Sequence, residues 1–482
     1  MPKLTTVLAG LALLALGDAV ALEETPCRLQ AEGMPAAFGL CSKLTVPADP
    51  AQPSAASLEL QAARIPALTA TPRPDPLLVI SGGPGQSAID FYLQLGNAFA
   101  PVRRDRDLIL LDQRGTGRSA AGFECGFPAG LELETAELDL LQRVLQECLA
   151  QIEQDPTLFT TSLAVQDLER LREALGVSRW NVYGVSYGTR VAQHYLRRFP
   201  DRVRALILDG VVPADLVLGP DTAPNAQTAL DAIFARCQAQ ADCGERFGDL
   251  GAKFARLRAA LRAEPVNLRG ADPLTGKPTD MRFGEAELQA VTRLMSYTSQ
   301  TAALLPLVID AAANGNLQPM AAQAQIVVRG LAASVSFPMH NSVVCAEDVP
   351  FFPADAMTVA GNSYLGNAIV QALTTICAHW PQGPIDTGFK TAVGSNRPVL
   401  LLSGQHDPVT PPTYANRVAA AGLRNSVHLI GPGQGHGMAG IGCVPRLMRR
   451  FLDSTDPTAL SADCLDNEPT PPFFLSFSGP AP

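Results

Sequence analysis

Short apolar runs recur along the first half of the chain and again near its end. Continuous runs of this length, bounded by turn residues, are typical of strands buried on both faces of a parallel sheet. The runs lie at residues 77–80, 108–111, 181–183, 205–208, 399–402 and 427–430. Residues 42–46 and 57–64 are also strand-like, and a turn-rich stretch separates them. We therefore expect a mostly parallel sheet.

Helical patterns occupy the stretches between these runs. Leu168, Leu171 and Leu175 recur at helical spacing, and Gly176 supplies a C-terminal stop. A second amphipathic pattern covers residues 191–199 and ends at a proline. Strands that alternate with helices predict an α/β fold in three layers, with helices on both faces of the sheet.

The rhythm changes in the middle of the chain, where Ala- and Leu-rich helical patterns dominate and strand signals are few. Residues 229–239 and 288–312 are the longest of these patterns, and Pro306 is expected to kink or divide the second. We interpret this region as a helical cap inserted into the sheet domain. The predicted organisation is a signal peptide (1–21), the first part of the core (22–213), the cap (214–392), the second part of the core (393–465) and a Pro- and Phe-rich tail (466–482).

The N-terminus has the pattern of a secretory signal peptide. Lys3 precedes the apolar run 7–16, and residues 19–21 form a small-x-small cleavage site, so cleavage is expected after Ala21. Ten apolar residues are too few to span the roughly 30 Å hydrocarbon core of a bilayer. The mature protein is therefore expected to be secreted or periplasmic, without stable membrane insertion.

Composition narrows the function further. The chain has 482 residues, with 37 Lys and Arg against 46 Asp and Glu, and its net charge is −9. A mildly acidic chain lacks the basic surface that nucleic-acid binding requires, so no nucleic-acid partner is expected. A hydrophobic content of 47% is ample for a packed core and excludes global disorder.

The ten cysteines form five close pairs when they are taken in chain order. An oxidising compartment favours disulfides, and short loops close easily, so sequential pairing is our prediction, although spacing alone does not fix connectivity. The predicted pairs are Cys27 with Cys41, Cys125 with Cys148, Cys237 with Cys243, Cys345 with Cys377, and Cys443 with Cys464. Neither Cys-x-x-Cys nor His-Glu-x-x-His occurs, so no metal site is predicted.

Ser186 is the candidate nucleophile. It lies in the sequence Gly-Val-Ser-Tyr-Gly (184–188), directly after one apolar run and before a helical pattern. Gly-x-Ser-x-Gly on a strand, turn and helix is the signature of a nucleophile elbow, in which the glycines relieve steric crowding around a strained serine backbone. The alternative interpretation is a structural Gly-rich turn.

A serine hydroxyl needs a base and an orienting carboxylate to become a nucleophile. Asp407 lies just past the apolar run 399–402, and His436 follows the run 427–430. This chain order of Ser, Asp and His is that of α/β hydrolases. We therefore predict Ser186 as nucleophile, His436 as general base and Asp407 as the residue that orients the imidazole.

Acyl transfer also requires hydrogen-bond donors for the tetrahedral oxyanion. The backbone N–H of Tyr187, the residue after the nucleophile, is one candidate. The loop Ser-Gly-Gly-Pro-Gly (81–85) follows an apolar run, and Gly83 is the preferred second donor, with Gly82 as the next choice. An ordinary Gly-Pro turn is the alternative. The charges of residues 112–119 are expected to support neighbouring loops by ion pairs rather than to bind a substrate carboxylate.

Six motifs in this order resemble a known family. They are Ser-Gly-Gly-Pro-Gly (81–85), Asp-Gln-Arg-Gly-Thr-Gly-Arg-Ser (112–119), Gly-Val-Ser-Tyr-Gly (184–188), Asp-Gly-Val-Val-Pro (209–213), Gly-Gln-His-Asp-Pro-Val-Thr-Pro (404–411) and Gly-Gln-Gly-His-Gly (433–437). As a set they resemble the proline iminopeptidase and tripeptidyl aminopeptidase family of α/β hydrolases, in particular its secreted, cysteine-rich tripeptidyl aminopeptidase-like branch. The resemblance covers nearly the whole mature chain.

This resemblance implies removal of residues from a free peptide N-terminus through an acyl-enzyme. In such enzymes acidic cap residues commonly hold the substrate ammonium, which makes Glu347 and Asp348 the candidates for that role. An ordinary charge pair at a helix end is the alternative. The resemblance implies no cofactor.

Two other functions remain open at this point. A carboxylesterase or lipase would use the same triad on a small ester, and a catalytically silent binding protein would keep the fold without the chemistry. The sequence does not predict the oligomeric state.

Overall fold

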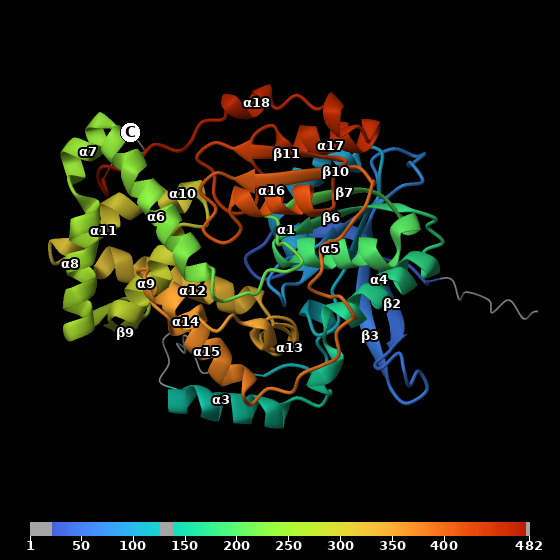
Figure 1. Cartoon of the computed structure of the whole chain (residues 1–482), viewed down its shortest axis with the longest axis horizontal. Helices are drawn as coiled ribbons and strands as arrows, with labels where there is room; N and C mark the ends of the chain where they lie inside the picture. Colours follow the sequence, from blue (N-terminus) through green and yellow to red (C-terminus); the bar gives the residue numbers. More distant parts are fainter. Residues whose placement is uncertain (1–21, 126–137, 479–482) are drawn as a thin grey trace, which may run out of the picture.

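The computed structural model describes residues 22–125 and 138–478 (Figure 1). Within these ranges one mixed sheet has nine strands, in the order β1-β2-β3-β5-β4-β6-β7-β10-β11. The strands are β1 (Thr25–Leu29), β2 (Ala37–Pro47), β3 (Ser57–Ile65), β4 (Leu77–Ile80), β5 (Leu108–Leu111), β6 (Trp180–Val185), β7 (Val203–Asp209), β10 (Val399–Gly404) and β11 (Ser426–Gly431). The predicted signal peptide, residues 1–21, lies outside the described residues.

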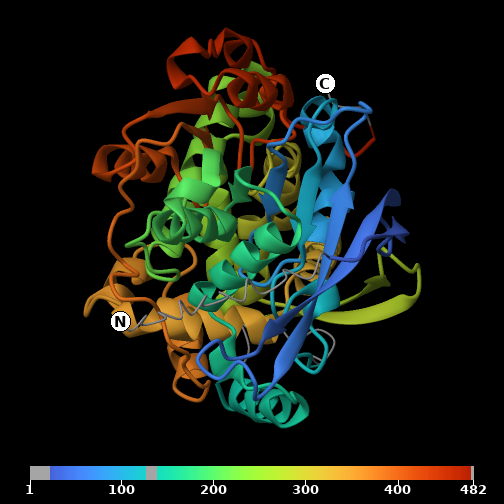
Figure 2. The same cartoon turned by 90° about the vertical axis from the view of Figure 1, so that its right-hand side faces the viewer.

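The sheet changes direction between its N-terminal strands and the rest. Strands β1, β2 and β3 pair antiparallel, and β3 also pairs antiparallel with β5. From β5 through β4, β6, β7, β10 and β11 every pairing is parallel. Figure 2 shows the N-terminal strands, drawn in blue, along one side of the molecule. The predicted mostly parallel sheet is confirmed.

Helices cover both faces of the sheet because successive residues of its strands point to opposite sides. In β4, Leu78 and Ile80 belong to the core beneath one face, whereas Leu77 and Val79 belong to the core beneath the other. Helices α4, α5 and α16 pack on the first face, and α1, α2 and α17 pack on the second. The helices outside the middle region are α1 (Ala88–Leu95), α2 (Ala100–Arg103), α3 (Leu138–Gln151), α4 (Thr161–Ala174), α5 (Tyr187–Arg198), α16 (Pro412–Ala421), α17 (Val444–Ser454) and α18 (Asp463–Asp466).

A mainly helical region separates β7 from β10, as the change of rhythm predicts. It has a hydrophobic core of its own, and in Figure 1 it lies beside the sheet domain. Its helices are α6 (Thr222–Ala239), α7 (Ala241–Phe247), α8 (Leu250–Ala263), α9 (Glu285–Met295), α10 (Ser299–Ala302), α11 (Leu305–Ala313), α12 (Gln318–Ser334), α13 (Phe337–Glu347), α14 (Ala356–Gly361) and α15 (Ala368–Cys377). We propose residues 214–392 as the limits of this cap.

Two features of the cap bear on the sequence predictions. Pro306 lies in the first turn of α11, where the missing N–H has no helical partner to lose, so the pattern 288–312 is divided rather than kinked. An antiparallel hairpin of β8 (Val266–Ala271) and β9 (Pro278–Phe283) was not predicted, because most of its side chains are exposed and produce no apolar run.

The C-terminal tail joins the core to the cap. After α18 it runs without helix or strand along the cap, and Figure 1 shows this red trace leaving α18 toward α6. The ring of Phe473 is buried, and the Arg236 guanidinium of α6 lies 3.9 Å from its centroid. The backbone N–H of Phe474 donates to the carbonyl of Ala303 at 3.1 Å. Phe473 and Phe474 therefore help to hold the two parts of the protein together.

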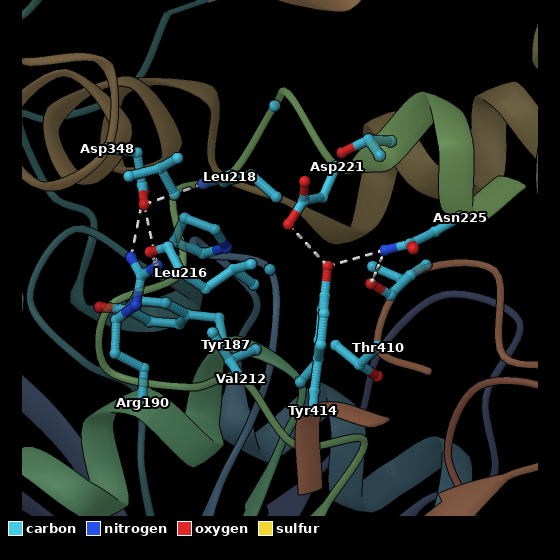
Figure 3. A pocket seen from close by; sticks show the side chains of 17 residues that line it. Tyr187, Arg190, Val212, Leu216, Leu218, Asp221, Asn225, Asp348, Thr410 and Tyr414 are labelled. Carbon is cyan, nitrogen blue, oxygen red and sulfur yellow. Dashed lines mark hydrogen bonds and ion pairs between the residues drawn. The ribbon is translucent and has the colours of Figure 1, made fainter. Parts of the chain in front are cut away.

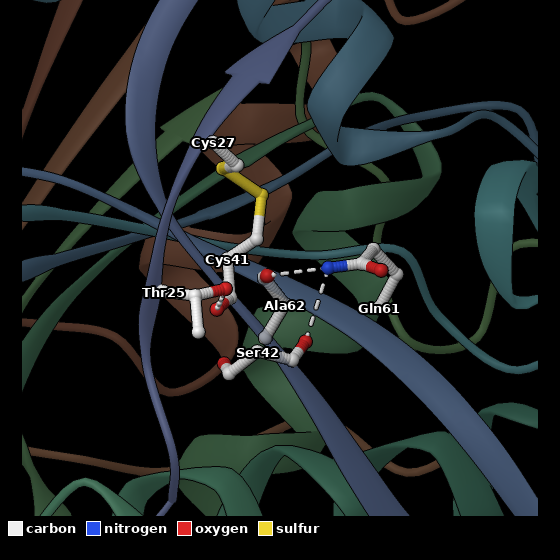
Figure 4. Close-up of a disulfide and its surroundings, with 6 residues drawn as sticks. All are labelled: Thr25, Cys27, Cys41, Ser42, Gln61 and Ala62. Carbon is white, nitrogen blue, oxygen red and sulfur yellow. Dashed lines mark hydrogen bonds between the residues drawn. A yellow bond between two sulfur atoms is a disulfide. The ribbon is translucent and has the colours of Figure 1, made fainter.

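The structure contains the five predicted disulfides. They join Cys27 to Cys41, Cys125 to Cys148, Cys237 to Cys243, Cys345 to Cys377, and Cys443 to Cys464. The first of them crosses the β1–β2 pair (Figure 4). Loops of this length are worth roughly 2–4 kcal/mol each to the folded state in the chain-entropy model. The cap contains two of these bridges, which suits a region with no large sheet of its own.

Candidate active site

Ser186 occupies the tight turn between β6 and α5. Its φ of 54° and ψ of −124° are rare for a residue with a side chain and are those of a strained turn between a strand and a helix. The turn needs glycine on its C-terminal side, because a Cβ on Gly188 would lie 2.5 Å from the carbonyl oxygen of Ser81. The Ser186 N–H donates to the Asp209 carbonyl at 2.8 Å. The predicted elbow geometry is therefore present.

His436 and Asp407 lie on the loops that follow β11 and β10, and they form a hydrogen bond. Asp407 Oδ2 lies 2.8 Å from His436 Nδ1. Asp407 Oδ1 accepts the backbone N–H groups of Val409 and Thr410, both at 2.8 Å. The Thr410 hydroxyl donates to Asp407 Oδ2 at 2.8 Å and lies 3.2 Å from His436 Nδ1. These contacts fix the carboxylate, and the carboxylate in turn fixes the orientation of the imidazole.

The loop that carries His436 is held from two directions. On the core side, the buried Asp209 carboxylate accepts the N–H groups of Met438 and Ala439, at 2.7 and 2.8 Å. On the cap side, the N–H of His436 donates to the carbonyl of Tyr297 at 2.6 Å, and the Tyr297 ring packs edge-on against the imidazole. The position of His436 thus depends on the cap as well as on the sheet.

The glycine loop after β4 approaches the nucleophile closely. A Cβ on Gly82 would lie 3.1 Å from the Cβ of Ser186, so any larger side chain would press on the nucleophile. The Gly82 N–H already donates to the Gln86 side chain at 3.3 Å, which favours Gly83 as the donor for an oxyanion. Tyr187 begins α5, and the first N–H groups of a helix have no partner within it.

The loop of residues 112–119 has the supporting role predicted for it. Asp112 is buried and accepts hydrogen bonds from the Ser87 hydroxyl at 2.6 Å and the Ile89 N–H at 3.1 Å. Arg114 is also buried and forms a two-pronged ion pair with Asp167 of α4, at 2.7 and 2.9 Å. These contacts anchor the start of α1 and the neighbouring loops. Because the Asp167 carboxylate already pairs with Arg114, Arg114 has no role in binding a substrate anion.

A pocket opens beside the nucleophile (Figure 3). Ser186, Gly83 and Tyr187 are among the residues that line it. The lining combines apolar side chains from the segment after β7 with polar and charged groups. The remaining lining residues are Pro84, Arg190, Val212, Leu216, Val217, Leu218, Gly219, Asp221, Thr222, Asn225, Asp348, Val409, Thr410 and Tyr414.

Two family models match the chain. The model described as the alpha/beta hydrolase fold matches residues 75–272, and the model described as TAP-like protein matches residues 362–464. This chain is an α/β hydrolase with a TAP-like C-terminal region. The family resemblance predicted from the motifs is therefore confirmed at this level.

The relatives of this hydrolase include both peptidases and an esterase. The serine protease Hip1 of Mycobacterium tuberculosis is 27% identical over 434 residues, which cover 81% of this chain and 80% of that protein. The tripeptidyl aminopeptidase of Streptomyces lividans is 26% identical over 404 residues, which cover 77% of this chain and 73% of that protein. Carboxylesterase B of Mycobacterium tuberculosis is 29% identical over 460 residues, which cover 87% of this chain and 85% of that protein. The chain is a serine hydrolase. Its relatives are named as peptidases in two cases and as an esterase in the third.

The structure gives Glu347 and Asp348 of this hydrolase other partners than a substrate. Glu347 is fully buried and accepts the N–H and the hydroxyl of Thr161, at 2.7 and 2.8 Å. Asp348 receives Arg190 at 2.8 and 3.1 Å and Lys390 at 3.2 Å. Two cations already compensate these carboxylates, so the arrangement does not support their predicted role as holders of a substrate ammonium.

Several residues at this site were not predicted. Thr410, Asp209 and Tyr297 hold the His436 loop, and Asp221 contributes a carboxylate to the pocket. Thr410 and Asp209 each lie in a motif that resembles the family, and that motif was the only signal for them. Tyr297 and Asp221 belong to the cap, and nothing local in the sequence marks them.

Two structural absences hold for the described residues. They contain no cluster of three or more His, Cys, Asp or Glu side chains suited to a metal ion. Across the same ranges, no helix combines the length and apolar character needed to cross a bilayer.

Proposed function

We propose that this serine hydrolase is an exopeptidase that releases residues or short peptides from free peptide N-termini. The observation that carries this proposal is the carboxylate of Asp221, which lines the same pocket as Ser186. Among the described residues no Lys, Arg or His forms an ion pair with it. A carboxylate without a cation, in a pocket beside a nucleophile, offers a binding place to a substrate ammonium.

The surroundings of Asp221 support this role. Its Oδ2 accepts the Tyr414 hydroxyl at 3.0 Å, and that hydroxyl accepts the Asn225 side-chain amide at 2.9 Å (Figure 3). These contacts orient the carboxylate without neutralising its charge. The cation in the same pocket, Arg190, is already paired with Asp348, so the charge left for a ligand is negative.

The proposed mechanism uses the groups of this chain alone. Ser186 Oγ attacks the substrate carbonyl while His436 takes the serine proton, and the N–H groups of Tyr187 and Gly83 receive the oxyanion. His436 then protonates the leaving amine, and an acyl-enzyme remains on Ser186. Water activated by His436 cleaves that ester and restores the serine.

The pH profile tests the role of His436. Burial lowers the pKa of His436, but the adjacent Asp407 and the more distant Asp209 raise it more, so the net pKa lies above 6.5. A protonated imidazole accepts no proton from serine, so kcat/KM is expected to fall about tenfold per pH unit below an inflection that itself lies above 6.5. A rate that stays flat down to about pH 4 would contradict this assignment.

A substrate panel decides between this function and the alternatives. It compares free and N-acetylated aminoacyl and tripeptidyl anilides with p-nitrophenyl esters, and the proposal predicts that acetylation abolishes cleavage of the anilides. Equal cleavage of free and blocked anilides would refute the exopeptidase. Ester cleavage without amide cleavage would favour the carboxylesterase, which the likeness to carboxylesterase B also supports. Failure of a fluorophosphonate to label the folded protein would leave only a silent binding protein.

Asp221→Asn tests the ammonium site itself. Loss of a charge-assisted hydrogen bond of about 1.5–3 kcal/mol is expected to lower kcat/KM for free-amine anilides roughly 10- to 100-fold. Esters that lack an amine should be cleaved as before. The matched control is Asp215→Asn, which removes the same charge from an exposed carboxylate that pairs with Arg417 outside the pocket. An equal loss for both classes of substrate would remove Asp221 from the ammonium site.

We propose further that residues 1–21 are a signal peptide and that the mature enzyme acts outside the cytoplasm, secreted or periplasmic. Five disulfides are expected to form and persist only in an oxidising compartment, and this supports the proposal. The N-terminal sequence of the exported protein tests it, with Leu22 expected as the first residue.

A further inference from the structure

The cap helix α13 contacts the glycine loop at its N-terminal end. The N–H of Ser336 donates to the Gly85 carbonyl at 2.9 Å, and Gln86 forms a β-bridge with Val335. The fit is close, because a Cβ on Gly85 would lie 2.6 Å from the Ser336 carbonyl oxygen. The loop that supplies the proposed donor Gly83 thus lies directly against the start of this helix.

The other end of α13 reaches the second proposed donor through one threonine. Glu347 Oε2 accepts the Thr161 hydroxyl at 2.8 Å, and the same hydroxyl lies 2.6 Å from the Tyr187 hydroxyl. A hydroxyl has one hydrogen to donate. When Glu347 is ionised, Thr161 gives its hydrogen to the carboxylate and accepts the hydrogen of Tyr187. A directed chain of hydrogen bonds therefore leads from Glu347 to the residue that follows the nucleophile.

A buried ion pair strengthens the same contact. Arg190 lies one turn after Tyr187 on α5, and it binds Asp348 at 2.8 and 3.1 Å and lies 3.5 Å from Glu347. Lys390 adds a second cation to Asp348. Burial raises the pKa of Glu347 to about 7, although the Arg190 charge opposes the rise. Paired charges at such depth fix the end of α13 against the first turn of α5.

We propose that helix α13 sets the spacing of the oxyanion hole and that Glu347 is its positioning residue, acting through Thr161 and Tyr187. The inference rests on the proposed acyl-transfer site, but not on the choice between peptide and ester substrates. Both proposed donors are held by opposite ends of one helix, so a shift at either end changes the distance between them. Displacement of a reacting group by about 1 Å costs roughly 100-fold in rate.

Glu347→Gln breaks the chain with little change of shape. The carboxylate accepts from both the N–H and the hydroxyl of Thr161, whereas the amide has one acceptor oxygen and an NH₂ group that only donates. The Thr161 hydroxyl then loses its acceptor. It is no longer fixed as the acceptor of the hydrogen bond from the Tyr187 hydroxyl. We expect kcat to fall roughly 10- to 100-fold, with KM changed less than about twofold, because the oxyanion exists only after attack.

The test compares this variant with Asp167→Asn. Asp167 is also a buried carboxylate that pairs with an arginine, and it lies on α4 with Thr161, away from the pocket. A trifluoromethyl ketone analogue of the best panel substrate, whose adduct carries the oxyanion, should bind Glu347→Gln more weakly in proportion to the loss of kcat. Asp167→Asn should lower thermal stability while it leaves kcat and this affinity unchanged. Similar kcat values for Glu347→Gln and wild type would overturn the proposal.

A second set of variants keeps the test open if Glu347→Gln does not fold. Thr161→Val removes the hydroxyl and should lower kcat, whereas Thr161→Ser keeps it and should restore most of the rate. As a single variant, Tyr187→Phe should lower kcat. Added to Thr161→Val, it should cause little further loss of kcat. Additive losses would overturn the proposal. Wild-type protein that cleaves no panel substrate and takes up no fluorophosphonate would instead refute the proposed function.

Discussion

Ser186→Ala is expected to lower kcat by roughly 10⁴- to 10⁶-fold on whichever panel substrate the wild-type protein cleaves. The variant keeps the elbow backbone, since alanine and serine meet the same steric conditions at a φ of 54°. What disappears is the atom that forms the acyl-enzyme in the proposed mechanism, and the residual rate should come only from binding and the proposed oxyanion donors. Fluorophosphonate labelling should be lost together with the rate.

A second serine provides the control for this result. Ser403 is buried at the end of β10, and its hydroxyl lies 2.9 Å from His428 Nε2, but neither residue lines the pocket. Ser403→Ala should therefore keep both labelling and turnover, with a modest loss of stability. Labelling that persists in Ser186→Ala and disappears in Ser403→Ala would show that the nucleophile has been misassigned.

The sheet could be predicted because burial leaves a direct mark on sequence. Strands β4, β5, β6, β7 and β10 are buried at almost every position, so each contains a short, largely apolar run. Strand β1 escaped prediction because Leu29 is its one fully buried residue, and a disulfide and a neighbouring strand hold the rest. The hairpin β8–β9 escaped for the same reason.

The candidate triad could be predicted because each of its residues follows a strand of the parallel part of one sheet. The carboxyl ends of such strands lie along one edge, so loops distant in sequence come together there. No comparable rule predicts which residues of the sheet domain a cap residue contacts. The partner of Glu347 is a threonine 186 residues earlier in the chain, and the partner of Asp348 is an arginine of the nucleophile helix. A pair of acidic residues in sequence therefore gives no indication of whether their charges are free.

The cap of this hydrolase contributes to four parts of the proposed site. Tyr297 holds the His436 loop, the start of α13 holds the glycine loop, and Glu347 holds the residue after the nucleophile through Thr161. Asp221 adds the charge that the pocket presents to a substrate. We infer that the cap and the sheet must fold together for the site to form, which is consistent with the contacts of the C-terminal tail with the cap.

Asp407→Asn is expected to lower kcat by about 10⁴-fold, the second-largest effect in this protein. In the proposed mechanism His436 Nδ1 donates to Asp407 Oδ2, which lies 2.8 Å away, and this leaves Nε2 free to take the proton of Ser186. An asparagine that turns its NH₂ group to Nδ1 favours the opposite tautomer, in which Nε2 carries the proton and accepts none. Asp407 is also the main group that raises the pKa of His436, so the acidic inflection of the remaining activity should move to lower pH.

The control for this variant has the same local chemistry at a different place. Asp456 is exposed, and it accepts the N–H and the hydroxyl of Thr458 at 2.9 and 2.7 Å, much as Asp407 accepts those of Thr410. Asp456→Asn should therefore share any general effect of an aspartate-to-asparagine change in a loop, but it should keep full kcat and the wild-type pH profile. A loss below about tenfold for Asp407→Asn, with an unmoved inflection, would mean that another group orients His436, and the adjacent Thr410 hydroxyl would be the first to examine.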